Sequence, residues 1–150
     1  MKTMIALVAL LIHSVCISSP LLDFPESGKM TVNLLHWRFV AHEENYNMYM
    51  DHESVGANKP VIELLSVVSF DAGKEWNYWL VPNIPIKHIV AHGNLYCQHE
   101  AYIIRSMWYV DAEDNLVRVE RYQFGEFGSE MGVSGTARNA MLLMACKSNL

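Results

Sequence analysis

The stretch HIVAHGNLYCQHE, residues 88–100, closes an apolar, β-branched segment. It contains one cysteine, Cys97, and three histidines close to it in sequence. Imidazole and thiolate groups are ligands that zinc prefers, so the stretch raises the question of a metal site. The other interpretation is a disulfide, in which Cys97 ties the end of a strand to another part of the fold. The choice depends on the compartment in which the protein resides, and the first residues of the chain bear on that.

The chain begins with MKTMIALVALLIHSVCISSP, which has the layout of a secretory signal peptide. A short positive region precedes an unbroken apolar run that is too short for a membrane-spanning helix of about 20 residues. We predict a signal peptide over residues 1–18, cleaved after Ser18. Two alternatives stay open. One is a buried N-terminal helix, and the other is a lipoprotein acylated at Cys16, for which His13 and Val15 are unfavourable neighbours.

Export leaves an even pair of cysteines, Cys97 and Cys146, in an oxidising compartment, where such a pair is expected to form a disulfide. The loop closed would be roughly fifty residues, for which the chain-entropy model gives about 4 kcal/mol of stabilisation. The remaining candidate ligands are then His88, His92 and His99. On an extended strand His88 and His92 share a side but lie about 13 Å apart, too far for one ion. We expect no metal and no cofactor, with a histidine zinc site as the alternative.

Composition narrows the class of protein and its partners. Without the signal peptide, about 130 residues remain, enough for one domain with a core. Acidic residues outnumber Lys and Arg 16 to 11 and no basic run appears, which argues against a nucleic-acid partner. No second segment has membrane-spanning length, so we expect no transmembrane segment in the mature chain. Residues 19–33, SPLLDFPESGKMTVN, are rich in Pro, Ser and Gly, and predict a flexible leader before a domain over 34–150.

The domain opens with LLHWRFVAH, in which Leu35, Trp37, Phe39 and Ala41 alternate with other residues and are expected to share one face. Residues 71–85 fit a long loop. Segments with strand character lie at 34–42, 46–51, 61–70, 86–97, 101–110 and 116–124. Six strands in sequence with short connections predict an antiparallel meander.

The segment VSGTARNAMLLMACK, residues 133–147, changes to helical periodicity. A first face carries Asn139, Leu142, Leu143 and Cys146, and a second carries Ala137, Ala140, Met141 and Met144. A helix that is apolar on two sides is expected to be buried on the sheet, with a homodimer contact as the alternative. The fold class is therefore α+β, with Cys146 able to pin the helix to the strand that ends at Cys97.

The order of these motifs resembles the surface-adhesin protein E-like domains of bacterial envelopes, over roughly residues 34–147. The motifs are Trp37 in the opening strand, YMDHESV with Tyr49, Asp51, Ser54 and Val55, the cysteine that ends NLYC, Tyr109 in the strand that follows, and MLLMAC in the closing helix. Two segments depart from the pattern. FGEFGSEMGVSG lacks the tryptophan and proline often found there, and the WNYW loop is unusual.

The resemblance implies an α+β domain whose helix is tied across the sheet by a disulfide, in an exported protein with relatives that bind host extracellular-matrix proteins. Six positions carry over as scaffold: Trp37, Tyr49, Asp51, Ser54, Cys97 and Cys146. Asp51 and Ser54 are expected to organise a turn through side-chain hydrogen bonds to backbone groups.

We therefore expect an exported protein of the periplasm, outer membrane or cell surface that binds a protein partner in an adhesin-like role. The alternative is a periplasmic structural or accessory protein without adhesin activity. No enzyme is expected, because the sequence lacks G-x-S-x-G, H-E-x-x-H and a glycine-rich phosphate loop. Trp76, Tyr78 and Trp79 form the candidate partner-binding patch, since aromatic side chains dominate binding hot spots. The competing interpretation is that two of these rings cap the core.

Overall fold

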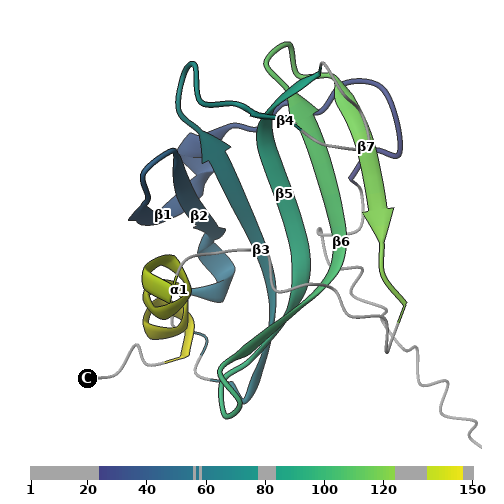
Figure 1. Cartoon of the computed structure of the whole chain (residues 1–150). Helices are drawn as coiled ribbons and strands as arrows, with labels where there is room; N and C mark the ends of the chain where they lie inside the picture. The colour runs from purple at the N-terminus through teal and green to yellow at the C-terminus, as the bar shows by residue number, and fades with distance from the viewer. Residues whose placement is uncertain (1–23, 56, 58, 78–83, 124–134, 147–150) are drawn as a thin grey trace, which may run out of the picture.

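The computed structural model describes residues 24–55, 57, 59–77, 84–123 and 135–146, and these form an antiparallel sheet and a C-terminal helix (Figure 1). The elements in chain order are η2 (Leu34–His36), β1 (Trp37–His42), β2 (Tyr46–Asp51), η3 (His52–Ser54), β3 (Val61–Phe70), β4 (Trp76–Asn77), β5 (Pro85–Tyr96), β6 (Ala101–Asp111), β7 (Leu116–Arg121) and α1 (Gly135–Cys146). The α+β fold predicted from the sequence is confirmed. The predicted signal peptide lies outside the described residues.

The strands follow one another in the order β1-β2-β3-β5-β6-β7, each antiparallel to its neighbour, and β4 pairs with the start of β5. The long central strands β3, β5 and β6 are rich in the β-branched and aromatic residues that suit a pleated, buried surface. The register of β5 on β6 shifts between His92 and Gly93. A side chain at Gly93 would lie 2.9 Å from the ring of Tyr102 and equally close to the Ile104 backbone, so the strands approach there only around glycine.

Apolar side chains are buried on both faces of the sheet. One face forms the helix-side core, in which α1 contributes Ala137, Met141, Leu142 and Ala145, and the strands contribute Met48, Met50, Leu64, Ile86, Leu95, Ile104 and others. The opposite face forms the strap-side core of Met30, Leu65, Val67, Val90, Trp108 and Val110. Burial on both faces explains why β3 is a nearly continuous apolar run, without the alternation of a half-buried strand.

Residues 24–33, which we call the strap, cover the second face. Met30 is buried in the strap-side core, and the ring of Phe24 lies 4.9 Å from that of Trp108. Backbone hydrogen bonds join Met30 N to Asp114 O, and Leu116 N to Gly28 O. The prediction of a flexible leader is therefore wrong for this part of the chain, because two large apolar side chains anchor a segment whose composition otherwise suggests a loose linker.

The first strand is shorter than the sequence pattern predicted, and its side chains do not all face the predicted side. Leu34–His36 forms a 3-10 turn, in which Asn33 accepts a hydrogen bond from Leu35 N, and the strand begins at Trp37. The register of β1 on β2 then shifts between Phe39 and Ala41, so Val40 is an extra residue. Leu35 is 90% exposed and Phe39 is 50% exposed, whereas Val40 is buried. Trp37 and Phe39 thus share the strap side as predicted, whereas Leu35 precedes the strand and Ala41, after the extra residue, packs against the helix-side core.

The helix buries residues from both of its predicted apolar faces, Ala137 and Met141 from the second and Leu142 from the first. Ala137, Met141 and Ala145 are fully buried at spacings of one turn, while Leu143 is 54% exposed. Figure 1 shows α1 lying at the β1 and β2 end of the curved sheet, and it contacts β1. Among the described residues, no helix has the length and apolar character needed to cross a membrane.

Candidate functional site

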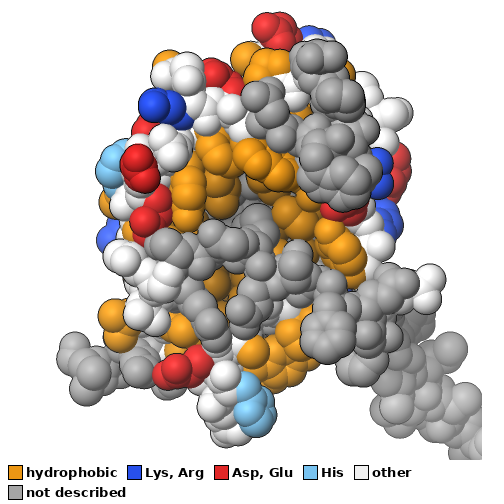
Figure 2. All heavy atoms as spheres, viewed as in Figure 1, with side chains coloured by type: hydrophobic (Ala, Val, Ile, Leu, Met, Phe, Trp, Pro, Cys, Tyr) orange, Lys and Arg blue, Asp and Glu red, His pale blue; other side chains and the backbone are white. Residues whose placement is uncertain are grey.

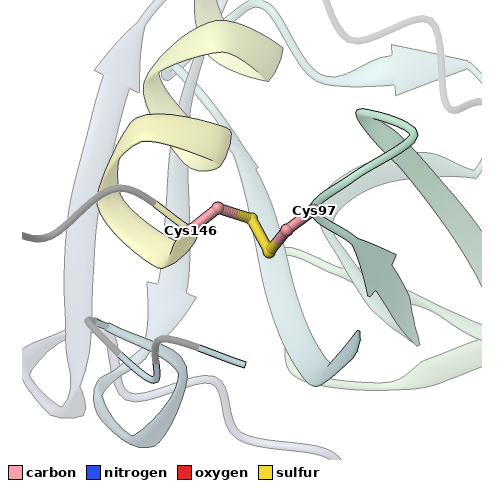
Figure 3. The surroundings of a disulfide bond; sticks show 2 residues. All are labelled: Cys97 and Cys146. Atoms are coloured by element: carbon pink, nitrogen blue, oxygen red, sulfur yellow. A yellow bond between two sulfur atoms is a disulfide. The ribbon is translucent and has the colours of Figure 1, made fainter. Parts of the chain in front are cut away.

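The disulfide joins Cys97, directly after β5, to Cys146, the last residue of α1 (Figure 3). The two Cα atoms are 5.6 Å apart, and the bond joins residues that are 49 positions apart in the sequence. Cys97 is also held through its backbone, because its N–H donates to Pro60 O at 3.0 Å. The predicted pairing is confirmed, and it fixes the C-terminal end of the helix to the hairpin end of β5 and β6.

Asp51 and Ser54 form the turn that leads from β2 into β3. Asp51 caps the 3-10 turn of His52–Ser54 by accepting from Ser54 N at 3.1 Å and from Ser54 Oγ at 2.8 Å. The same carboxylate accepts from Leu65 N at 2.9 Å, which links the turn to β3. The hydrogen bonds expected of this pair are present, and they occupy both oxygens of Asp51.

The other two positions carried over from the resemblance, Trp37 and Tyr49, lie on the strap side of the sheet. Both pack against the strap-side core, and the Tyr49 ring meets Phe39 edge to face with centroids 5.8 Å apart. Because Phe39 is half exposed, this corner of β1 and β2 presents aromatic surface to solvent.

The histidines of the opening stretch have separate surroundings. His92 Nε2 lies 2.8 Å from Glu63 Oε1 on the neighbouring strand. His88 Nδ1 is buried and has no hydrogen-bond partner among the described residues. Burial and the positive charge of Lys87 hold the pKa of His88 below its usual range, while Asp114 acts in the opposite direction. His99 lies in the turn after β5, where its N–H donates to Tyr96 O. Among the described residues, no three potential metal-ligating side chains come together.

His92 lies opposite Ser106, and with Glu63 the three side-chain types match those of a nucleophilic triad. The hydroxyl of Ser106, however, accepts from Arg121 Nη1 at 3.1 Å, and that guanidinium also pairs with Glu26 of the strap. Ser106 is buried as well. Ser106, Arg121 and Glu26 therefore fasten the strap to the sheet, and the burial of Ser106 keeps its hydroxyl away from a substrate.

The predicted partner-binding patch is described only at Trp76, since Tyr78 and Trp79 lie outside the described residues. Trp76 belongs to β4, the short strand within the segment expected to be a loop. Its ring stacks on Tyr109 with centroids 6.1 Å apart, and the residue is 36% exposed. Trp76 is thus half packed against the sheet and half open, and a binding role for the patch stays a prediction.

A polar cluster on the last two strands has no counterpart in the sequence predictions. The phenols of Tyr109 and Tyr122 donate to one oxygen of Glu120 at 2.8 and 2.7 Å, and Arg118 Nε donates to the other at 3.0 Å. Both phenols also lie 3.6 Å from the sulfur of Met107. The cluster braces β6 against β7. Figure 2 shows that hydrophobic side chains gather on the face of the molecule turned toward the viewer.

A shallow hollow of about 320 Å³ lies beside the Asp51 turn. Its lining is Asp51, Glu53, Ala57, Lys59, Val61, Ile62 and Glu63. Two of its carboxylates are already engaged, Asp51 with backbone and hydroxyl donors and Glu63 with His92. The other charged residues of its lining are Glu53 and Lys59.

No family model, curated protein or solved structure matches this chain. The resemblance to the surface-adhesin domains rests on the order of the motifs in the sequence. The described sites indicate a braced scaffold, whose half-exposed aromatic side chains, Phe39 and Trp76, lie on different strands.

Proposed function

We propose that this protein is exported to the bacterial envelope or cell surface and binds a protein partner there, in the manner of the adhesin-like domains it resembles. The observation that supports the proposal is the Cys97–Cys146 disulfide. Disulfides form and persist in oxidising compartments and are rare where thiols are kept reduced. The signal-peptide layout of residues 1–18 independently points to export.

The way in which polar residues are used favours binding over chemistry. Asp51, Ser106 and Glu120 each accept hydrogen bonds that hold two parts of the chain together. Phe39 and Trp76, in contrast, keep a large share of their surface open to solvent. Aromatic side chains contribute much of the free energy at protein interfaces, because they bury large areas at small entropic cost.

Export is tested with the full chain carrying a C-terminal tag and produced in a bacterium. We expect a chain processed after Ser18, found in the exported fraction, with no titratable thiol before reduction. A matched variant with Leu7→Arg, which breaks the apolar run of the signal, should remain unprocessed. Unprocessed wild-type chain in the cytosol, with reactive Cys97 and Cys146, would overturn the proposal.

Binding is tested with the purified oxidised protein against immobilised extracellular-matrix proteins and isolated envelope proteins. Saturable binding to a matrix protein supports the adhesin-like role. Binding to envelope proteins alone favours the alternative, a periplasmic accessory protein. Trp76→Ala should weaken binding if the predicted patch contributes, whereas Lys74→Ala in the preceding exposed turn should leave it unchanged.

A further inference from the structure

We propose that the outer edge of β1 is a docking edge, at which an extended acidic segment of a partner protein adds as a further strand. This inference rests on the proposed binding function and assigns it a location and a partner chemistry. β1 is the first strand in the order of the sheet, so one side of its backbone faces no other strand of the described chain. Edge strands of this kind pair readily with extended peptides.

The two edges of the sheet differ in how they are covered. At β7 the strap bonds to the strand and its turn, through Leu116 N to Gly28 O and through a bridge between Lys29 and Asn115. At β1, within the described part of the chain, no backbone hydrogen bond reaches the outer side of Trp37–His42 from another segment. Figure 1 likewise shows β1 at the margin of the molecule, with α1 beside it.

Charge decides what kind of segment fits this edge. Residues 34–42 carry Arg38 and the exposed His36 and His42, and no Asp or Glu, in a chain whose formal net charge is −5. Arg38 is exposed and forms no ion pair with any described residue. A second copy of the chain paired through β1 would bring like charges together, which is unfavourable between neighbouring strands. A partner with acidic side chains is favoured instead.

The alternation of β1 also specifies the pattern of the added strand. Trp37 and Phe39 lie on the strap side of the sheet, and Arg38 points to the other side. An incoming strand therefore places apolar side chains beside the half-exposed Phe39 and acidic side chains beside Arg38. The extra residue at Val40 limits the regular part of the edge, so the segment that docks is short.

The probe for this inference is an eight-residue peptide of alternating valine and glutamate, titrated onto the purified oxidised protein. We expect saturable binding together with slowed amide hydrogen exchange in Trp37–His42. Arg38→Glu should weaken binding about tenfold, because it places a like charge at the edge. The matched reversal Lys74→Glu, in the exposed turn after β3, should leave binding unchanged.

Two control peptides separate strand addition from general attraction. A valine–lysine peptide of the same length, and a valine–glutamate peptide with alternate amides N-methylated, should both fail to bind. Equal binding by either peptide, or binding without protection of β1, overturns the inference. So does protection of β1 that grows with protein concentration when no peptide is present, since that would mark a second copy as the occupant.

The outcomes also separate this inference from the function on which it rests. If the protein binds a matrix or envelope protein equally well as wild type and as Arg38→Glu, the function stands and the docking edge is refuted. If the acidic peptide protects β1 but neither class of protein binds, the edge stands and the proposed function fails.

Discussion

Opening the Cys97–Cys146 disulfide is the perturbation whose size can be worked out most directly. Cys97→Ser and Cys146→Ser each release a loop with a sequence separation of 49 residues. The chain-entropy model gives about 4 kcal/mol for a loop of this length. For a domain of this size, that loss lowers the Tm by roughly 10 to 15 °C. The two variants should agree with each other, because each removes the same bond.

The assay is thermal unfolding followed by circular dichroism, for the wild type, both single variants and the double variant. The double variant should melt where the singles do, since effects on one shared bond do not add. Reduced wild-type protein should melt there too. Leu143→Ser, on the exposed side of the same helical turn, is the control and should leave the Tm nearly unchanged.

Two results would refute this reasoning. The first is a large difference in Tm between the two single variants, which would mean that one cysteine contributes by packing and not through the bond. The second is an unchanged Tm on reduction, with both thiols titratable, which would mean that the helix is held on the sheet without the disulfide.

Three further predictions concern the core and its pH dependence. Gly93→Ala should destabilise by about 2 to 3 kcal/mol, because the added carbon overlaps backbone of β6, whereas Gly135→Ala has open space and should not. Met141→Ala, at a site 1% exposed, should cost about 2 to 4 kcal/mol in urea unfolding, against under about 0.5 for the exposed Leu143→Ala. Burial lowers the pKa of His88 in the folded state, so the stability linked to this group is present above about pH 6.5 and is lost as the pH falls through the folded-state pKa. His88→Leu should therefore flatten that part of a curve of unfolding free energy against pH, and an unchanged curve would contradict this.

Much of the fold follows from local sequence patterns. The strands at 61–70, 86–97 and 101–110 are within one residue of β3, β5 and β6, because each is a long β-branched or aromatic run with a clear end. The disulfide was predicted by counting the cysteines that remain after a predicted signal peptide, which needs no knowledge of the fold. Connectivity was equally accessible, since short links between successive strands favour a meander.

The features that the sequence did not reveal depend on contacts between distant residues. The strap contains few apolar residues, so its sequence does not predict that it packs on the sheet. The role of Met30 and Phe24 becomes clear only from their contacts with the strap-side core. The hydrogen bond of Tyr109 to Glu120 depends on the register of β6 on β7. Register is set by turns and bulges, which alternation alone does not locate.

The sheet is apolar on both faces, and this explains where a partner can reach it. A strand such as β3, buried on both sides, needs a cover on each side, and the chain supplies α1 on one and the strap on the other. The strap is fastened to β7 through Glu26 and Arg121, while α1 is fastened to the hairpin of β5 and β6 through the Cys97–Cys146 disulfide. Each cover closes a face, and the strap also reaches the backbone of β7. Of the two edge strands, β1 has one side of its backbone that pairs with no other described strand, and it carries the half-exposed Phe39 and the exposed Arg38. These features are why we expect a partner strand to add at β1.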